Sequence, residues 1–266
     1  MLEDKILVFG GPYSNLQATQ KMYEITVELG FEPSQIICTG DVVGYCAQPQ
    51  ETIDLVKSWG IHWLAGNVEQ QLATGAEDCG CNFDEGSRCS NFSQTWFPYA
   101  QIHVSENAKE EMKTLPENLV LEISGYKVGV VHGGLDDISQ FIFKSTSPEV
   151  KEEILDRLGV DIVVAGHSGI PFHQRLEKGL WVNAGVIGMP ANDGQQEVWF
   201  AIVDLKTKTV EHRSFSYDWK TAKALMEQAN LPAAYSKTLE TGLWDNMEIL
   251  PEQEKLERGK PMIFEA

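Results

Sequence analysis

The chain has 266 residues, of which 42% are hydrophobic and 23% are charged, as in an ordinary globular protein. It carries 39 acidic side chains against 21 basic ones, a formal net charge of −18. This excess of carboxylates argues against binding along a nucleic-acid backbone or at an anionic membrane surface, because both need a basic footprint. No apolar run approaches the roughly 18 residues of a membrane span. A phosphorylated small molecule would need a local positive centre, and a metal ion is the obvious one.

The two ends of the chain and its cysteines bear on location and domain organisation. Residues 1–5 lack the basic region and cleavage site of a signal peptide, and the five cysteines are an odd number. We therefore expect a cytoplasmic protein with reduced thiols. We expect one domain at residues 1–216 and an extension at 217–266 packed on it. The extension could cover a sheet edge, contact a second subunit of a homo-oligomer, or partly fray.

Along the chain, strands and helices alternate, which favours an α/β sheet. Apolar residues recur at helical spacing between glycine or proline stops, and short apolar runs mark the strands. An aromatic cluster at residues 92–99 fits one face of a further helix. The other expected helices cover residues 16–29, 49–59, 107–113, 149–158 and 218–229, and the expected strands cover 5–9, 36–39, 63–65, 119–123, 127–131, 161–165, 181–183, 198–203 and 209–215.

Four of the expected strands stop at a glycine or valine that is followed directly by a polar side chain. Such a position is where open α/β sheets collect their ligands, so we expect the four to meet at one edge of one sheet. A carboxylate, an amide oxygen and two imidazoles form a ligand set suited to Mn, Fe or Zn. The four side chains are Asp41, Asn67, His132 and His167.

The order and spacing of these strand ends closely resemble the calcineurin-like metallophosphoesterases, from about Ile6 to Val203. The motifs of that family run Asp-x-His, Gly-Asp, Gly-Asn-His, His and Gly-His-x-His, and residues 183–188 resemble its Asn-Pro-Gly-Ser-Val-Gly turn. The resemblance implies an α/β fold, the four-layer α/β/β/α sandwich of two facing mixed β-sheets, here with a C-terminal helical tail.

Several of the family's ligands are replaced in this chain. Gly11 stands where the family has its first metal-binding Asp, Tyr13 where it has His, and Gly169 where it has the last His. In the family these three positions serve the first metal alone. The ligands of the second metal all survive, so the resemblance implies one divalent transition metal (Mn, Fe or Zn) per chain. They are Asp41, Asn67, His132 and His167.

Two further positions are candidates for catalysis beside these ligands. Val68 replaces the family His that helps stabilise the transition state, and Glu69 follows it. Glu69 could assist the reaction, or it could simply begin a helix, where an acid suits the helix dipole. Tyr13 could donate a hydrogen bond to a phosphate oxygen, or it could fill the volume that the missing ligands leave. We include Tyr13 and Glu69 among the candidate catalytic residues.

The stretch from residue 78 to residue 89 is the least family-like part of the chain. It holds Cys79, Cys81 and Cys89 in what we expect to be a glycine-containing loop, and Cys46 could join them. The four thiols could bind zinc or iron, although their spacing is not a paired Cys-x-x-Cys array. A redox-sensitive dithiol is a second interpretation. A packed loop with buried thiols is a third, and the sequence does not choose among them.

Two functions of different classes remain in view. The first is a one-metal phosphoesterase that hydrolyses a phosphodiester, a nucleotide or another small phosphorylated substrate with a metal-activated water. Without the second metal the clamp on attacking and leaving oxygens is lost, so turnover should be poor unless other groups compensate. The alternative is a catalytically inactive protein of the same fold that senses a metal, a redox state or a ligand, because fold alone does not guarantee chemistry.

Overall fold

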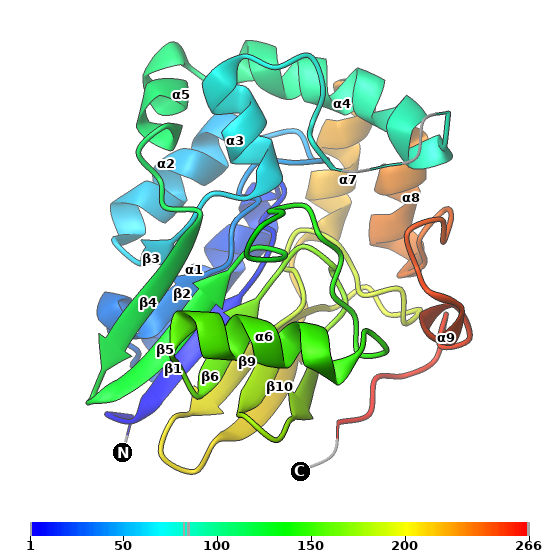
Figure 1. Cartoon of the computed structure of the whole chain (residues 1–266). Coiled ribbons are helices and arrows are strands. Elements are labelled where there is room, and N and C mark those ends of the chain that lie inside the picture. Colours follow the sequence, from blue (N-terminus) through cyan, green and yellow to red (C-terminus); the bar gives the residue numbers. More distant parts are fainter. Residues whose placement is uncertain (1, 82, 84–85, 265–266) are drawn as a thin grey trace.

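The protein, described as a computed structural model, is built on two five-stranded sheets (Figure 1). The structure describes residues 2–81, 83 and 86–264, so positions 82, 84 and 85 of the cysteine-containing stretch and the chain ends lie outside it. The first sheet has the strand order β10-β9-β1-β2-β3 and the second β4-β5-β6-β8-β7. The strands are β1 (Lys5–Phe9), β2 (Ile36–Cys38), β3 (His62–Trp63), β4 (Asn118–Ile123), β5 (Tyr126–Val131), β6 (Ile162–Ala165), β7 (Phe172–Arg175), β8 (Leu180–Asn183), β9 (Val198–Asp204) and β10 (Thr209–Phe215).

Both sheets are mixed. β1, β2 and β3 run parallel, while β9 and β10 complete the first sheet in antiparallel pairing. In the second sheet β5, β6 and β8 run parallel, and β4 and β7 are antiparallel edge strands. The helices are α1 (Leu16–Leu29), α2 (Pro49–Trp59), α3 (Asn67–Thr74), α4 (Arg88–His103), α5 (Glu106–Met112), α6 (Pro148–Leu158), α7 (Trp219–Gln228), α8 (Ala233–Thr241) and α9 (Glu252–Lys255).

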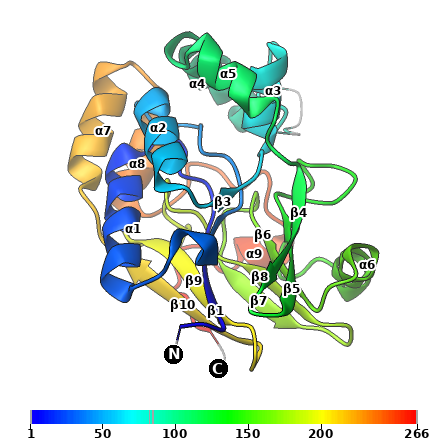
Figure 2. The same cartoon turned by 90° about the vertical axis from the view of Figure 1, so that its left-hand side faces the viewer.

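The layers follow from the alternation of side chains along each strand. In β1, Ile6 and Val8 enter the apolar core between the sheets, whereas Leu7 and Phe9 belong to the core under the helices that cover the first sheet. A third apolar cluster lies between α6 and the outer face of the second sheet. Figure 2 shows α1, α2 and α7 outside the first sheet and α6 outside the second. The expected sandwich of two facing mixed sheets is therefore confirmed.

One expectation about the site is wrong. The four polar strand ends do not lie at one edge of one sheet, because β2 and β3 belong to the first sheet and β5 and β6 to the second. Asp41 and Asn67 therefore approach from one sheet, and His132 and His167 from the other. The strand-end pattern is local: it identifies where each buried strand stops but carries no information about which sheet the strand joins.

Several elements and one boundary were not expected from the sequence. β7 has polar residues in three of its four positions and pairs only with β8, so it lacks the apolar run of a buried strand. α8 and α9 were missed inside the C-terminal extension, and α3 was foreseen only as one interpretation of Glu69. α4 begins at Arg88, so Cys89 lies in a helix rather than in a loop. No helix of the described residues is long and apolar enough to cross a membrane.

The C-terminal extension packs on the same body. α7 and α8 pack against each other, and α7 also contacts α1. Trp244 then fixes the following segment to the loop after β8: its backbone N–H donates to Asn192 Oδ1 at 2.9 Å, and its indole N–H donates to the Pro190 carbonyl at 2.8 Å. The chain runs on through α9 and ends on the same side of the molecule as its N-terminus (Figure 1). The extension thereby reaches the loops that surround the candidate site.

Candidate metal centre

Four ligand-type atoms converge where the two sheets meet. His132 Nε2 lies 3.1 Å from Asn67 Oδ1 and 3.1 Å from His167 Nδ1. The same nitrogen lies 3.3 Å from Asp41 Oδ2. The ligand atoms of Asp41, His132 and His167 all lie within 4.8 Å of one another, and all four side chains are buried. The structure therefore brings together the whole ligand set expected from the sequence.

The hydrogen bonds around this cluster show which atoms face its centre. His132 Nδ1 lies 2.7 Å from the Thr39 carbonyl oxygen, which can only accept, so this nitrogen carries a proton. Asn67 Nδ2 donates to the Cys79 carbonyl at 2.8 Å, which turns Oδ1 inward. An unprotonated His132 Nε2 would then face the oxygens of Asp41 and Asn67. Lone pairs crowded in this way need either a proton on Nε2 or a metal ion between them, and the oxygen and nitrogen donor set suits a divalent metal ion.

The charge states of Asp41 and His167 suit metal binding, whereas His132 has to give up a proton when an ion binds. Burial alone would raise the pKa of Asp41. The adjacent His132 lowers this pKa by a larger amount, so the pKa of Asp41 lies below its ordinary value. Burial lowers the pKa of His132, yet the Asp41 carboxylate more than offsets this and leaves it raised. Burial and the neighbouring His132 lower the pKa of His167 to about 3. His167 is therefore neutral at ordinary pH, as a metal ligand must be.

An unusual backbone conformation helps to place two of the candidate ligands, Asp41 and His167. Asp41 and His167 have φ of 54° and 59°, the left-handed region that L-residues seldom adopt. Such strain is typical of functional sites. Asp41 Oδ1 accepts from the Val68 N–H at 3.3 Å, in the first turn of α3, where the helix dipole favours a carboxylate. A Cβ on Gly66 would lie 2.0 Å from that oxygen, so only glycine fits there.

Glu69 lies behind the ligands rather than among them. One carboxylate oxygen accepts from the backbone N–H of Asp41 at 2.9 Å and of Gly66 at 2.8 Å. The other accepts from the Val43 N–H at 2.9 Å. Burial, together with the nearby Asp41, raises the pKa of Glu69 to about 7. The side chain thus ties the Asp41 loop to the start of α3.

Aromatic rings occupy the surroundings of the three positions where the family's other ligands are replaced. A Cβ on Gly11, whose φ is 31°, would lie 2.6 Å from Tyr13 Cζ. A Cβ on Gly169, whose φ is 72°, would meet the Trp244 indole at 3.4 Å. The buried Tyr13 ring in turn packs on Tyr45, with ring centroids 4.7 Å apart. Rings from the first loop and from the C-terminal extension therefore fill this half of the site.

The four candidate cysteines are not gathered around one point. Cys79 and Cys81 are joined by a disulfide, so the expectation of reduced thiols fails for this pair. Cys46 Sγ contacts the Gly188 carbonyl at 3.8 Å, and Cys89 Sγ contacts Asn246 Oδ1 at 3.5 Å. Within the part of the chain that the structure describes, one group of three or more His, Cys, Asp or Glu side chains is close enough to hold a metal, and it contains no cysteine.

A pocket of about 90 Å³ opens over Asp41 and His167. Its lining includes Cys81 and Cys89, and no lysine or arginine among the described residues. No sequence pattern indicated that the C-terminal extension contributes to this pocket, because its aromatic residues look like ordinary helix or loop side chains. The aromatic lining residues are Tyr13, Tyr45, Phe83, Phe141, Tyr235 and Trp244.

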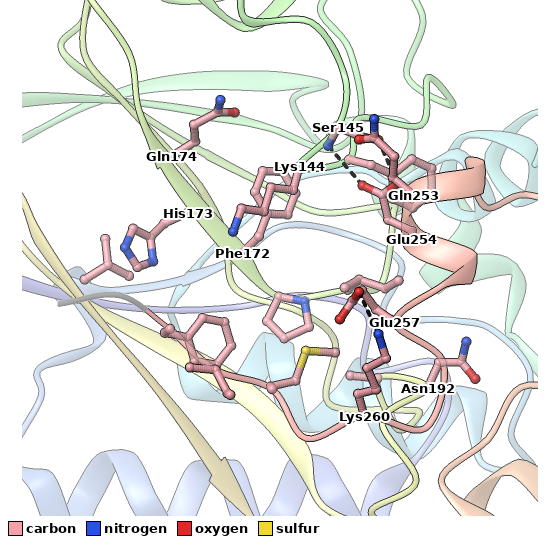
Figure 3. A pocket seen from close by; sticks show the side chains of 18 of the residues that line it. Lys144, Ser145, Phe172, His173, Gln174, Asn192, Gln253, Glu254, Glu257 and Lys260 are labelled. Atoms are coloured by element: carbon pink, nitrogen blue, oxygen red, sulfur yellow. Dashed lines mark hydrogen bonds and ion pairs between the residues drawn. The ribbon is translucent and has the colours of Figure 1, made fainter.

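A much larger cavity, of about 1050 Å³, lies elsewhere. It is bounded by β7, by the loop around Lys144 and by the C-terminal segment, as Figure 3 shows for Lys144, Phe172 and Lys260. None of the four metal ligands lines it. The volume of a cavity alone would therefore misplace the site in this protein.

Two facing mixed sheets with a buried Asp, Asn and two His at their meeting strand ends define an α/β protein with a candidate metal centre. Residues 5–208 match the calcineurin-like phosphoesterase superfamily domain. The chain therefore belongs to the calcineurin-like phosphoesterase superfamily.

Comparison with individual proteins shows which chains and folds this protein is similar to. The chain is 25% identical over 249 residues to the uncharacterized protein MJ0912 of Methanocaldococcus jannaschii, covering 87% of this chain and 96% of that protein. Among solved structures, the hypothetical protein PH1004 of Pyrococcus horikoshii OT3 superposes with a TM-score of 0.76 at 21% identity, over 90% of this chain and 99% of that one. A metallophosphoesterase from Sphaerobacter thermophilus gives 0.71 at 19% identity, over 90% and 99% of the two chains. At these identities the two structures show the fold alone.

Proposed function

We propose that this protein is a metal-dependent phosphoesterase that works with a single divalent ion. The observation that carries the proposal is the convergence of three ligand-type atoms, from Asp41, Asn67 and His167, on His132 Nε2 while its Nδ1 is bound to the Thr39 carbonyl. The mixed oxygen and nitrogen set suits Mn, Fe or Zn. An ion held there would supply Lewis-acid activation of a phosphoryl group and of water. Its ligands would be Asp41, Asn67, His132 and His167.

The pocket over the ligands supports a narrow substrate class. Its volume of about 90 Å³ lies below the roughly 300–1,000 Å³ of sites for drug-sized ligands. Asp41 and Asp245 line it, and its described lining offers no lysine or arginine to a highly charged phosphate. We therefore favour a small phosphodiester, with a single negative charge and an apolar ester group, over a nucleoside polyphosphate.

Two residues have distinct proposed roles beside the ion. Burial raises the pKa of Tyr13 well above its ordinary value, so its hydroxyl stays protonated and can donate to a phosphate oxygen. Glu69 is a positioning residue, because both of its oxygens accept from backbone N–H groups of the ligand loops. A cytoplasmic location belongs to the same proposal.

The test is hydrolysis of a small phosphodiester such as methyl p-nitrophenyl phosphate, which has one small ester group, with Mn²⁺ added to the purified protein. We expect slow, Mn-dependent turnover that His132→Ala reduces to background. The matched control is His103→Ala, because His103 is exposed and lies on α4, where its ring stacks on Tyr99. Protein that carries one Mn²⁺ per chain and shows no hydrolysis would overturn the proposal.

That outcome would favour a second function, a catalytically inactive protein that binds a metal and a small ligand. The filled half of the site is the observation in its favour, because the Tyr13 ring and the Trp244 indole occupy the surroundings of two replaced family ligands. A protein of this kind should retain its metal affinity and bind phosphodiesters without cleaving them. Equilibrium binding of the uncleaved ester would distinguish this inactive binding protein from an enzyme that is inactive because it has lost its metal.

A further inference from the structure

The turn formed by Cys79, Gly80 and Cys81 lies directly against a metal ligand. Asn67 Nδ2 donates to the Cys79 carbonyl at 2.8 Å and approaches Cys81 Sγ at 3.3 Å. Both cysteines are buried and joined by a disulfide. Because both amide hydrogens of Asn67 point at this turn, its Oδ1 is held toward His132. The turn thus orients one of the four ligands, and such partners commonly change metal affinity 10- to 100-fold.

The same turn also contacts the loop that carries another ligand. The Gly80 carbonyl accepts from the Ser139 hydroxyl at 2.5 Å, and Ser139 lies in the loop that follows His132. Gly80 has φ of 63°, so the turn depends on a residue that adopts the left-handed region without cost. A change in the shape of this turn would therefore reach ligands from both sheets.

We propose that Cys79 and Cys81 form a redox-active modification site whose oxidation state sets the metal affinity of the centre through Asn67. This inference rests on the proposed metal-dependent function. Its reaction partners are thiol and disulfide compounds. In oxidation the two thiols lose two protons and two electrons and form one S–S bond, while a disulfide oxidant accepts both and is cleaved to two thiols. A dithiol reductant reverses the exchange and itself becomes a disulfide.

The geometry assigns the order of attack. Cys81 lines the pocket over Asp41 and Cys79 does not, so an incoming thiolate reaches the Cys81 sulfur. A mixed disulfide forms there, and Cys79 leaves as a thiolate and takes up a proton. The other thiols are poor competitors, because burial raises the pKa of Cys46 and of Cys89 and keeps them protonated.

Reduction has a defined consequence for the ligand. The S–S bond closes a small ring that presents the Cys79 carbonyl and the Cys81 sulfur to the same amide group. Once the bond is broken, the two sulfurs move to van der Waals separation and the turn can no longer hold both contacts. Asn67 Oδ1 is then less firmly oriented, so the reduced protein should bind metal about tenfold more weakly.

The experiment measures Mn²⁺ affinity of the intact chain by competition with a chelating dye, with no substrate present. One sample is equilibrated with oxidised dithiothreitol and the other with its dithiol form, and both are desalted without oxygen. Thiol counts by alkylation and mass spectrometry establish the redox state. We expect about tenfold weaker binding after reduction in the wild type and in the control Cys46→Ser, because Cys46 does not line the pocket. In Cys81→Ser both treatments should give the weak affinity.

Equal Mn²⁺ affinity of the oxidised and reduced wild type would overturn the inference and leave the metal site intact. Tighter binding by the reduced form would also overturn it, since it would mean that a thiol itself serves as a ligand. Absence of Mn²⁺ binding in both states would instead contradict the proposed function. The wild-type comparison alone decides these cases, so the result does not depend on whether Cys81→Ser folds.

Discussion

The two halves of the family's two-metal site differ in this protein: one half keeps its ligand side chains and the other has lost them. In one half, Asp41, Asn67, His132 and His167 keep their ligand atoms within reach of a common point. In the other half, glycines stand where ligands would project, and the rings of Tyr13 and Trp244 lie against them. Random loss of ligands would have damaged both halves. The division is what we expect if one half was retained as a metal site and the other, the rebuilt half, was replaced by packed aromatic side chains.

The supports of the two halves differ as well. The retained half is held by groups that act through hydrogen bonds: the Thr39 carbonyl on His132, the Glu69 carboxylate on the Asp41 loop, and the Asn183 amide on the Gly166 carbonyl before His167. The rebuilt half is held by ring contacts and by the anchor of Trp244. Hydrogen-bonded supports fix orientation, which metal ligation requires, whereas ring packing mainly excludes water and fills volume.

The largest expected effect is loss of the ion from the retained half. His132→Ala removes the atom that is shared by all the close ligand contacts, so bound metal should fall from about one per chain to near zero. Elemental analysis of the purified protein measures this directly. His103→Ala should keep its metal. Retention of one ion in His132→Ala would show that the retained half is not the metal site.

Glu69→Ala should be the most destabilising single change at the centre. It leaves three buried N–H groups without an acceptor, those of Asp41, Val43 and Gly66. At about 1–3 kcal/mol for each, the free energy of unfolding should fall by about 3 kcal/mol or more. Chemical denaturation measures it, with the exposed Glu77→Ala as control. A loss below about 1 kcal/mol would contradict the view that Glu69 supports the Asp41 loop.

Trp244→Ala tests the comparison between the two halves, because it removes a ring that fills the space beside Gly169 in the rebuilt half. The indole is half-buried and hydrogen-bonded to the Pro190 carbonyl, so removing it should cost about 2 kcal/mol. The metal content should stay at one ion per chain, because the opened space contains no ligand at positions 11 and 169. A second ion in this variant would mean that Trp244 alone had excluded it. Trp244→Phe is the control that keeps most of the volume.

The pH dependence of metal binding should report one proton. Because the pKa of His132 is raised beside Asp41, a proton competes with the ion there, and affinity should fall about tenfold per pH unit once the pH lies below that pKa. The pKa of His167, about 3, means that its nitrogen is already free. Calorimetry in buffers of different ionisation enthalpy counts the protons released. Two protons per ion would show that His167 is also protonated before metal binds.

The smallest expected effect compares two glycines of similar conformation. Gly169 and Gly125 have φ of 72° and 82°, so alanine at either should cost about 1 kcal/mol. Only Gly169 has a neighbour, the Trp244 ring at 3.4 Å, whereas nothing lies within 4 Å of the Cβ site at Gly125. Gly169→Ala should therefore lose a few tenths of a kcal/mol more, and the excess should vanish in a Trp244→Ala background. Equal losses in both backgrounds would mean that the ring does not press on Gly169.

Much of this structure could be predicted from local patterns. The helices at residues 16–29 and 49–59 begin and end where the sequence places them, since Gly30 and Gly60 adopt the left-handed conformation that ends a helix. The four candidate ligands could be identified because each stands within a few residues after the end of a strand. Glycine at positions 11 and 169 showed by itself that a family ligand was absent, since a hydrogen atom cannot bind a metal.

What the sequence could not decide depends on contacts between distant segments. The distribution of the ligands over two sheets depends on which strands pair, and the apolar pattern of a strand is the same whichever neighbour it joins. The disulfide between Cys79 and Cys81 and its contact with Asn67 depend on the path of a turn that has no regular pattern. Trp244 and Tyr235 reach the pocket only because the C-terminal extension folds back over loops far earlier in the chain. Residue types at strand ends thus determined the chemistry, and tertiary packing decided its surroundings.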